Sequence, residues 1–429
     1  MSSMRIAIAS SVFLFVSASQ LLAATVQVGT CRSGVPSFTA IQAAVNASSA
    51  GGTVLVCPGT YPEQVSIDKA LNILGAQNGT EKASIITAPS GGIVQNTTSL
   101  SSGNPIAAQI LVTNATGVNI SNLTVDGANS QISVGGCTPV NLVGVLYQNA
   151  SGMVNHLAVI NQALTGASIG CQSGLGIFVQ SGNSGTSNVS IVNNYVENYQ
   201  KNGITANEAG TTVTITANNV VGQGATTGAA ENSIQVGYGA AGKVSSNVAM
   251  DDVFSPDTIS SPGNAASGIL IFASAGVTVT SNIVGNTQFG IAFVSDATAG
   301  PADNGSIQGN RISATRVFDG VELCGSGNTV SGNIISGSDE SGVHIDSACG
   351  AVASNTVSQN TINDACAGIL TGTGAGSNTI GTNNFYNTRN TTLTADTCTP
   401  PVTSASPLVA AHAAAASGTS HARPSPARP

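Results

Sequence analysis

The sequence predicts an all-β protein, a parallel β-helix solenoid with an N-terminal amphipathic capping helix. A short phrase occurs three times, as Asn328-Thr-Val-Ser-Gly-Asn333, Asn355-Thr-Val-Ser-Gln-Asn360 and Asn378-Thr-Ile-Gly-Thr-Asn383, at intervals of 27 and 23 residues. A repeat of this length indicates a solenoid. It contains β-branched strand residues and an asparagine turn but no room for a helix, so each unit buries its apolar side chains by stacking on its neighbours.

Two columns of residues recur in constant order from about Val118 onward. One is a glycine followed by alternating apolar residues: Gly144, Gly176, Gly203, Gly268, Gly290, Gly320, Gly342 and Gly368, with Ser233 between Gly203 and Gly268. The other is an asparagine that ends a Val-x-Ile phrase: Asn194, Asn219, Asn247, Asn282, Asn310, Asn333, Asn360 and Asn383. Leucine-rich repeats, hexapeptide helices and propeller blades do not fit this spacing and composition.

The apolar residues after each glycine are predicted to point inward, as for Val321 with Leu323 and Val343 with Ile345. Coils stacked at about 4.8 Å bury such side chains on all sides. The asparagines suit left-handed turns and amide ladders between coils. By the same pattern His156 is expected to be a turn residue, in a position equivalent to Asn122.

The chain ends suggest targeting and tail segments. Residues 1–24 resemble a secretory signal peptide, with an apolar run from Ile6 to Val16, and no later run is long enough to span a membrane. Residues 25–398 form the predicted β-helix domain, with the capping helix at about 38–48 after Ser37 as N-cap. Residues 399–429, rich in Pro, Ala and Ser, are predicted to be disordered.

Composition excludes one class of function. The net charge is -8, the pI is about 4.8, and charged residues make up 7% of the chain without a basic cluster. Such a chain repels phosphate backbones, so no nucleic acid is expected as a partner. The eight cysteines of an exported chain predict disulfides rather than metal or redox centres. The preferred pairs, with other connectivities open, are Cys31 with Cys57, Cys324 with Cys349, Cys137 with Cys171, and Cys366 with Cys398.

The opening of the domain resembles a known family. Phe38-x-x-Ile41-Gln42 and the following Gly52-x-Val54-x-Val56-x-Pro58-Gly59 are similar to the cap helix and first coil of the pectin-lyase-like superfamily of right-handed parallel β-helices, in its exported bacterial form. The signature segments of pectin methylesterases are missing and the chain has no Trp, so that activity is excluded. Polygalacturonase-type signatures are represented by Asp251-Asp252 alone.

The densest group of ionisable residues lies near the C-terminal coils. Aligning Gly320 with Gly342 places Glu322 beside His344, with Asp346 two residues further along the same face. We therefore predict Glu322, His344 and Asp346 as catalytic residues, because a carboxylate beside an imidazole can act as acid and base on a uronic sugar. Arg316, Asp319, Asp339 and Glu340 enter the same sheet from its edge, and paired carboxylates here would also hold calcium. Plain solubilising charges are the alternative interpretation.

Two further sets complete the predicted site. A polar row on the same sheet is expected to bind substrate together with Arg316 and Asp319, followed by Leu270 and Phe272: Gln148, Gln180, Asn207 and Gln235. A Ser/Pro loop offers oxygen ligands for calcium: Asp251, Asp252 and Asp257. An ordinary polar surface and ordinary turn residues are the alternatives.

Two functions of different class remain open. The first is a secreted, periplasmic or cell-surface protein, expected to be a monomer, that binds or modifies an acidic polysaccharide by lyase- or hydrolase-like chemistry on an outward sheet face. The second is a non-catalytic envelope, adhesion or structural solenoid. The sequence does not decide between them, nor does it identify the glycan or a metal.

Overall fold

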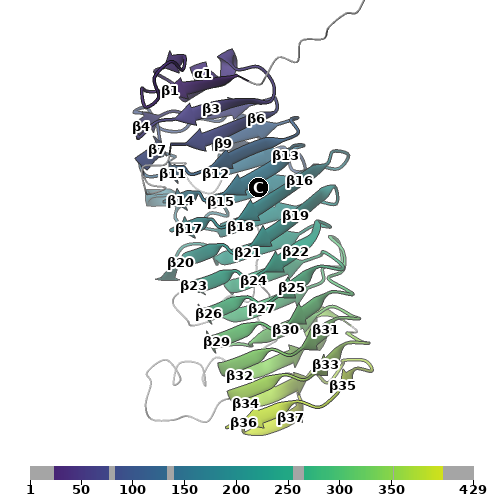
Figure 1. The fold of residues 1–429 in the computed structure, drawn as a ribbon. Coiled ribbons are helices and arrows are strands. Elements are labelled where there is room, and N and C mark those ends of the chain that lie inside the picture. The colour runs from purple at the N-terminus through teal and green to yellow at the C-terminus, as the bar shows by residue number, and fades with distance from the viewer. Residues whose placement is uncertain (1–23, 77–82, 133–139, 255–264, 351, 400–429) are drawn as a thin grey trace, which may run out of the picture.

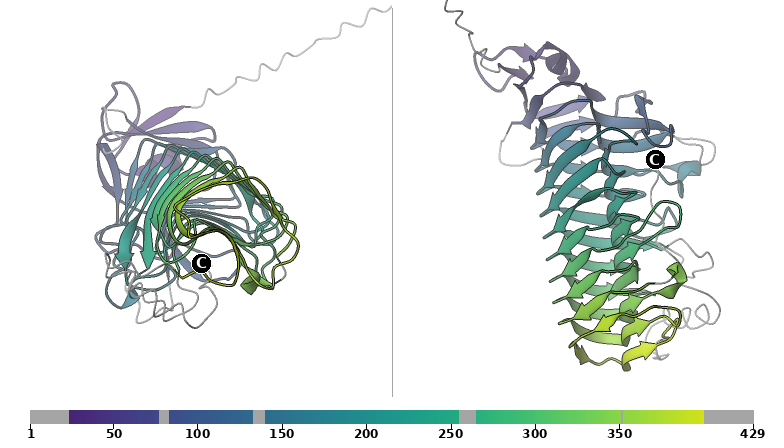
Figure 2. Two further views of the ribbon diagram at one scale, coloured as in Figure 1. Left: turned by 90° about the horizontal axis from the view of Figure 1, so that it is seen from below. Right: turned by 90° about the vertical axis from the view of Figure 1, so that its right-hand side faces the viewer.

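A computed structural model describes residues 24–76, 83–132, 140–254, 265–350 and 352–399. The chain winds into a long stack of coils that runs from the N-terminal strands to the C-terminal ones (Figure 1). Seen along the stack, the coils superimpose around a common interior (Figure 2). The predicted signal peptide and tail fall almost entirely outside the described residues.

Three ladders of parallel strands form the faces of the stack. The first ladder, in spatial order, comprises β2 (Ser37–Phe38), β1 (Thr25–Val28), β3 (Gly52–Val56), β6 (Leu71–Gly75), β10 (Val118–Ser121), β13 (Ser151–Asn155), β16 (Ser187–Val192), β19 (Thr211–Thr216), β22 (Ala241–Ser245), β25 (Thr278–Thr280), β28 (Ser306–Gln308), β31 (Thr329–Ser331), β33 (Thr356–Ser358) and β35 (Thr379–Ile380). The second comprises β4 (Gly59–Pro62), β7 (Ser84–Thr87), β11 (Thr124–Asp126), β14 (Ala158–Ile160), β17 (Tyr195–Glu197), β20 (Asn219–Thr226), β23 (Val248–Phe254), β26 (Ile283–Thr287), β29 (Arg311–Thr315), β32 (Ile334–Ile345), β34 (Thr361–Thr371) and β36 (Asn384–Tyr386).

The third ladder carries most of the predicted site. It comprises β5 (Val65–Ile67), β9 (Pro105–Thr113), β12 (Asn141–Gln148), β15 (Leu175–Gln180), β18 (Asn202–Asn207), β21 (Asn232–Gly237), β24 (Ser267–Phe272), β27 (Phe289–Val294), β30 (Val321–Cys324) and β37 (Asn390–Thr394), with the C-terminal halves of β32 and β34 between the last two. Only β8 (Thr97–Thr98) pairs antiparallel among the described strands, with β9. Short 3₁₀ turns lie at Gly166–Ser168 and Ser347–Cys349.

The inward positions follow the predicted alternation. Val321, Leu323, Val343 and Ile345 are fully buried and belong to the main core, and Val321 pairs with Val343 on the next coil. Each fully buried Val or Ile contributes roughly 1.5–3 kcal/mol. Since neighbouring side chains in a strand point to opposite faces, Glu322 and His344 point away from this core.

The asparagine ladder is confirmed with one correction. Each amide donates to the side-chain oxygen of the next asparagine, and each such oxygen also accepts from the backbone N–H of the preceding one, along Asn194, Asn218, Asn247, Asn282, Asn310, Asn333, Asn360 and Asn383. The predicted member Asn219 is wrong, because it already begins β20 and pairs with Val248. His156 has φ of 54° beside Asn122 at 57°, as expected for a turn.

The glycine column allows the coils to approach closely. A Cβ at Gly290 would lie 2.3 Å from the carbonyl oxygen of Gly320, and one at Gly320 would lie 2.8 Å from that of Gly342. Both distances are too short for any side chain, which explains why the column is almost all glycine. Ser233 takes the one different position in this column.

The helix at the N-terminal end is shorter than predicted. It runs over α1 (Ile41–Ala47), and its residues Ile41, Ala44 and Val45 join the main core. The prediction of Ser37 as N-cap is wrong, since Ser37 lies in β2. Instead, the carboxylate of Glu63 accepts hydrogen bonds from the backbone N–H groups of Ile41 and Gln42, at 2.7 and 3.0 Å. That α1 protects the end of the solenoid stays a prediction.

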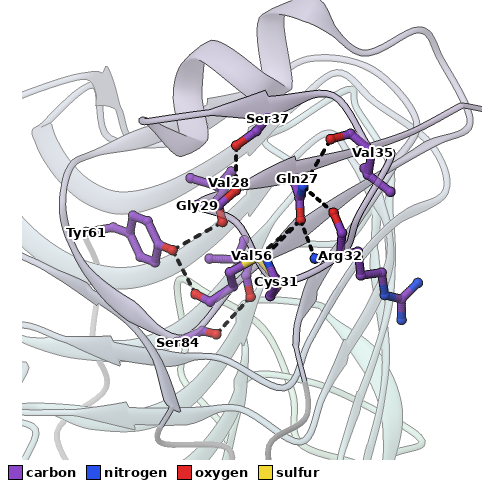
Figure 3. The surroundings of a disulfide bond; sticks show 11 residues. Gln27, Val28, Gly29, Cys31, Arg32, Val35, Ser37, Val56, Tyr61 and Ser84 are labelled. Atoms are coloured by element: carbon purple, nitrogen blue, oxygen red, sulfur yellow. Dashed lines mark hydrogen bonds between the residues drawn. A yellow bond between two sulfur atoms is a disulfide. The ribbon is translucent and has the colours of Figure 1, made fainter.

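Disulfides fasten loops to the coils. Cys31–Cys57, Cys324–Cys349 and Cys366–Cys398 are confirmed. Beside the first, the Gln27 amide binds both ends of the loop that contains Cys31: it donates to Arg32 and Val35 and accepts from the backbone of Cys31 and Arg32 (Figure 3). The predicted pair Cys137 with Cys171 includes Cys137, which lies outside the described residues.

Candidate functional site

The predicted pair Glu322 and His344 lies side by side on adjacent coils. β30 and β32 place the two residues in direct register. The His344 Nδ1 atom lies 3.4 Å from Glu322 Oε2 and 3.5 Å from Asp319 Oδ2. Asp319 directly precedes Gly320, and the Ser341 hydroxyl donates to its other oxygen at 2.6 Å. We call Asp319, Glu322, His344 and Asp346 the acidic cluster.

Asp346 closes the cluster on the side of a disulfide. Its Oδ1 accepts a hydrogen bond from Ala348 N at 2.8 Å, and its Oδ2 lies 3.8 Å from the sulfur of Cys324. The same sulfur is 3.4 Å from Glu322 Oε1. The Cys324–Cys349 disulfide therefore forms one wall of the cluster.

The acidic cluster is buried, which the sequence did not predict. The exposed fraction is 3% or less for each of its four side chains. Burial raises the pKa of the Glu322 carboxyl well above its ordinary value, and the nearby Asp346 and Asp319 carboxylates raise it further. The expectation of solvent-facing charges on this sheet is therefore wrong for these residues.

Three of the four predicted edge residues form hydrogen bonds with groups outside the acidic cluster. Arg316 donates through Nε to Asn286 at 2.5 Å. The Asp339 carboxylate accepts from Val317 N at 2.8 Å, and the Glu340 carboxylate accepts from Cys398 N at 2.9 Å. Of the edge residues, the structure brings Asp319 within 4 Å of His344.

The predicted polar row is real in part. Gln148, Gln180 and Asn207 occupy equivalent positions on β12, β15 and β18. On β21 that position is Gly237, and Gln235 lies two residues before it, paired with Thr205. The amides bind one another: Gln148 donates to Gln180, and Gln235 donates to Asn207. All four side chains are buried, so the expectation of an exposed row is wrong.

An open cleft of about 410 Å³ adjoins the end of this row. Its lining includes Asn207, Glu208, Tyr238 and Asn183, together with Thr298 from a distant loop. Glu208 has φ of 84°, which is rare outside glycine, and its carboxylate accepts from the Gln180 amide and from Gly182 N. The Tyr238 ring packs on Phe272 with centroids 5.2 Å apart. Sequence reasoning missed Glu208, and the adjacent Asn207 was the available signal.

A second buried charge network was also missed. Asp252 accepts hydrogen bonds from the hydroxyls of Tyr199, at 2.7 Å, and Ser233, at 2.5 Å. Lys201 is fully buried and donates to the Ala230 carbonyl, while Glu231 accepts from Gln223 N. The available signal was Ser233, because it replaces glycine in an otherwise uniform column.

Burial dominates the titration of this network. It raises the pKa of Asp252 to about 8 and lowers that of Lys201 to about 7, and it raises the pKa of Glu231. The hydroxyls of Ser233 and Tyr199 act in the opposite direction on Asp252, and the carboxylates of Glu231 and Asp252 do so on Lys201.

The carboxylates of the predicted calcium loop bind different partners. Asp252 belongs to the buried network, whereas its neighbour Asp251 accepts from the Asn286 amide at 2.5 Å. Asp257 lies outside the described residues. Calcium at these three residues stays a prediction.

A broader groove of about 760 Å³ runs along the corner between the second and third ladders near the C-terminal coils. Asp339, Asp364 and Arg389 are among its lining residues. Among the described residues, the structure contains no helix with the length and apolar character needed to cross a bilayer.

Comparisons with known proteins agree on the fold. Residues 223–399 match the family model described as "Periplasmic copper-binding protein (NosD)", which covers less than half of the chain. No curated protein sequence matches. Two structures of the GH136 lacto-N-biosidase from Eubacterium ramulus are similar at TM-scores of 0.54 and 0.51, each with 12% identity, covering 85% and 86% of this chain and 68% of theirs.

The DFA-IIIase from Arthrobacter chlorophenolicus A6 is similar at a TM-score of 0.47 and 15% identity. The match covers 77% of this chain and 83% of that structure. At these identities the likeness concerns fold and not activity. The repeats, the parallel ladders and the likeness to the GH136 structures together identify the fold as a right-handed parallel β-helix.

Proposed function

We propose that the protein is an exported β-helix protein that binds or modifies an acidic polysaccharide, by lyase- or hydrolase-like chemistry, on the third ladder. The observation that supports this most directly is the acidic cluster, in which an imidazole and three carboxyl groups converge on adjacent coils of a chain with few other charges. Perturbed ionisable groups gathered in this way are typical of reaction centres.

The open cleft supports the binding half of the proposal. Asn207, Glu208 and Asn183 offer polar groups for sugar hydroxyls, and Tyr238 offers an aromatic face. From β18 to β30 there are four strand spacings, or about 19 Å. An extended glycan held at the cleft would therefore lie along the same sheet as the acidic cluster. Glu322, His344 and Asp346 are the proposed reacting groups, with Arg316 and Asp319 at the edge.

The disulfides support export. Three disulfides among the described residues are typical of proteins outside the reducing cytosol. We propose a secreted, periplasmic or cell-surface location for a monomer.

A second function is favoured by one observation. The acidic cluster and the amide row are buried, which suits a non-catalytic envelope or adhesion protein whose polar groups stabilise the solenoid. Such a protein would show no turnover, and its polar clusters would affect stability alone.

Turnover assays on a panel of acidic polysaccharides, with and without calcium, together with a glycan array, distinguish the two functions. We expect the wild type to cleave or eliminate at least one uronic glycan, and Glu322→Gln to lose about 10²–10⁴-fold in kcat/KM. His156→Asn is the matched control, because His156 is exposed at a left-handed turn position that asparagine occupies in the neighbouring coil, at Asn122. Binding without turnover would refute the catalytic half, and neither binding nor turnover would establish the structural alternative.

A further inference from the structure

Three residues of the acidic cluster present one donor atom each within a small volume. One ligand atom from each of Asp319, Glu322 and His344 lies within 4.8 Å of the other two, and all three side chains are buried. Asp319 and Glu322 come from the coil of β30, and His344 comes from the next coil on β32. The alignment of neighbouring coils, fixed by the stacked glycines, therefore brings these donors together.

The distances fit a metal site better than direct hydrogen bonds. The separations of 3.4 and 3.5 Å from His344 Nδ1 exceed the usual 2.7–3.2 Å of an N–H···O bond. A tetrahedral zinc ion with ligands at about 2.0–2.2 Å sets its ligand atoms about 3.3–3.6 Å apart. Both separations from His344 Nδ1 fall in that interval.

The two carboxylate oxygens provide an independent observation. Asp319 Oδ2 and Glu322 Oε2 are buried and accept no hydrogen bond from the described residues. A buried carboxylate oxygen without a donor is costly, because burial removes its water without replacing it. A cation between the two oxygens and the imidazole would satisfy both at once.

The donor set determines the class of metal. Calcium and magnesium take oxygen ligands, whereas imidazole with carboxylates is typical of zinc and related divalent transition metals. Cys324 and Cys349 lie close by with Asp346, but they are joined in a disulfide and offer no thiolate. We propose that Asp319, Glu322 and His344 bind one divalent transition-metal ion, zinc or a metal of the same ligand preference.

Such an ion would join two successive coils through side chains. This metal site goes beyond the proposed function, because a bound metal is compatible both with a reaction centre and with a structural solenoid. In the first case Glu322 and His344 would hold the ion and the ion would supply Lewis-acid chemistry, and in the second the metal would stabilise the coils.

Metal binding is measured on the full mature protein after a chelator has removed bound metal and excess zinc has then been added. We expect one zinc ion per chain to remain after gel filtration, and Co²⁺ to give the visible absorption of a tetrahedral nitrogen and oxygen site. Zinc at 100 times its Kd should shift the unfolding equilibrium about 100-fold toward the folded state. The Tm should then rise by about 4 °C for a domain of this size.

The variants Glu322→Gln and His344→Asn should lose both the stoichiometric zinc and the rise in Tm, while His156→Asn keeps them. Both site variants retain His412 and His421, so any binding by those histidines remains as background. Zinc retained equally by His344→Asn, or stabilisation by calcium and not by zinc, would overturn the proposal. A wild type that retains less than one-tenth of an equivalent would do so as well, whatever the glycan assays give.

Discussion

The asparagine ladder should be a large local source of stability, and Asn310 tests this. Its side chain takes part in four hydrogen bonds: it donates to Val279 O and Asn333 Oδ1, and it accepts from the backbone and side-chain amides of Asn282. Replacement by alanine removes all four in a fully buried position. At about 1 kcal/mol for each bond, Asn310→Ala should lower the free energy of unfolding by about 4 kcal/mol.

The expected change in Tm follows from the size of the domain. About 350 described residues, at about 2.1 cal/mol/K each, give an unfolding entropy near 0.7 kcal/mol/K. Asn310→Ala should therefore lower the Tm by about 5 °C in a calorimetric scan. Asn310→Asp keeps the shape but turns a donor into an acceptor, so it should lower the Tm further at neutral pH.

Asn188→Ala is the matched control, since Asn188 is an exposed strand residue on β16. Its Tm should stay within about 1 °C of the wild type. If Asn310→Ala and Asn188→Ala lower the Tm by the same small amount, the hydrogen bonds of the ladder do not contribute to the stability of the stacked coils.

Three further predictions concern the glycine column, the buried network and a disulfide. Gly290→Ala should cost at least about 1–3 kcal/mol, because its Cβ would overlap Gly320 O, whereas Gly91→Ala, which meets no atom within 4 Å, should be nearly neutral in the same scans. Burial raises the pKa of Asp252 to about 8, so its contribution to stability is present below about pH 4 and is lost as the pH rises toward 8. Asp252→Asn should flatten the fall in stability between pH 4.5 and 6.5 by up to about 1.4 kcal/mol per pH unit, and an unchanged slope would contradict this. The double variant in which Cys31 and Cys57 become alanine should lose about 2–4 kcal/mol, and an equal Tm for this variant and the wild type would show that the Gln27 hydrogen bonds suffice.

Much of the fold was predictable because its determinants recur along the chain. The inward residues of β30 and β32 were predictable from the spacing after Gly320 and Gly342, and the same alignment placed Glu322 beside His344. The helix N-cap was not, because the groups that bind the N-terminus of α1 come from Glu63, 22 residues away from Ile41. Similarly, Asn218 and Asn219 are adjacent and chemically identical, so only hydrogen bonding to neighbouring coils shows which one joins the ladder.

The burial of the candidate site was beyond the reach of the repeat pattern. Alternation along a strand gives the face on which Glu322 or Gln180 lies, but it does not show what lies over that face. Cover comes from segments between the strands: Leu100 N donates to Gln180, and the Cys324–Cys349 disulfide borders Glu322. These segments have no fixed length or repeated residues, so a single sequence does not reveal them.

The equivalence of ladder positions has a consequence for how such a chain changes in length. Asn282 and Asn310 make the same contacts one winding apart, and the segment 283–310 between them forms a complete winding. Excision of that segment would join two equivalent positions. The coils on either side would then stack with the same ladder contacts that they make now. The protein can therefore be shortened or extended by whole windings. Excision of this winding would bring the cleft near Asn207 about 4.8 Å closer to the cluster near Glu322, and it would also remove Thr298 from the lining of that cleft.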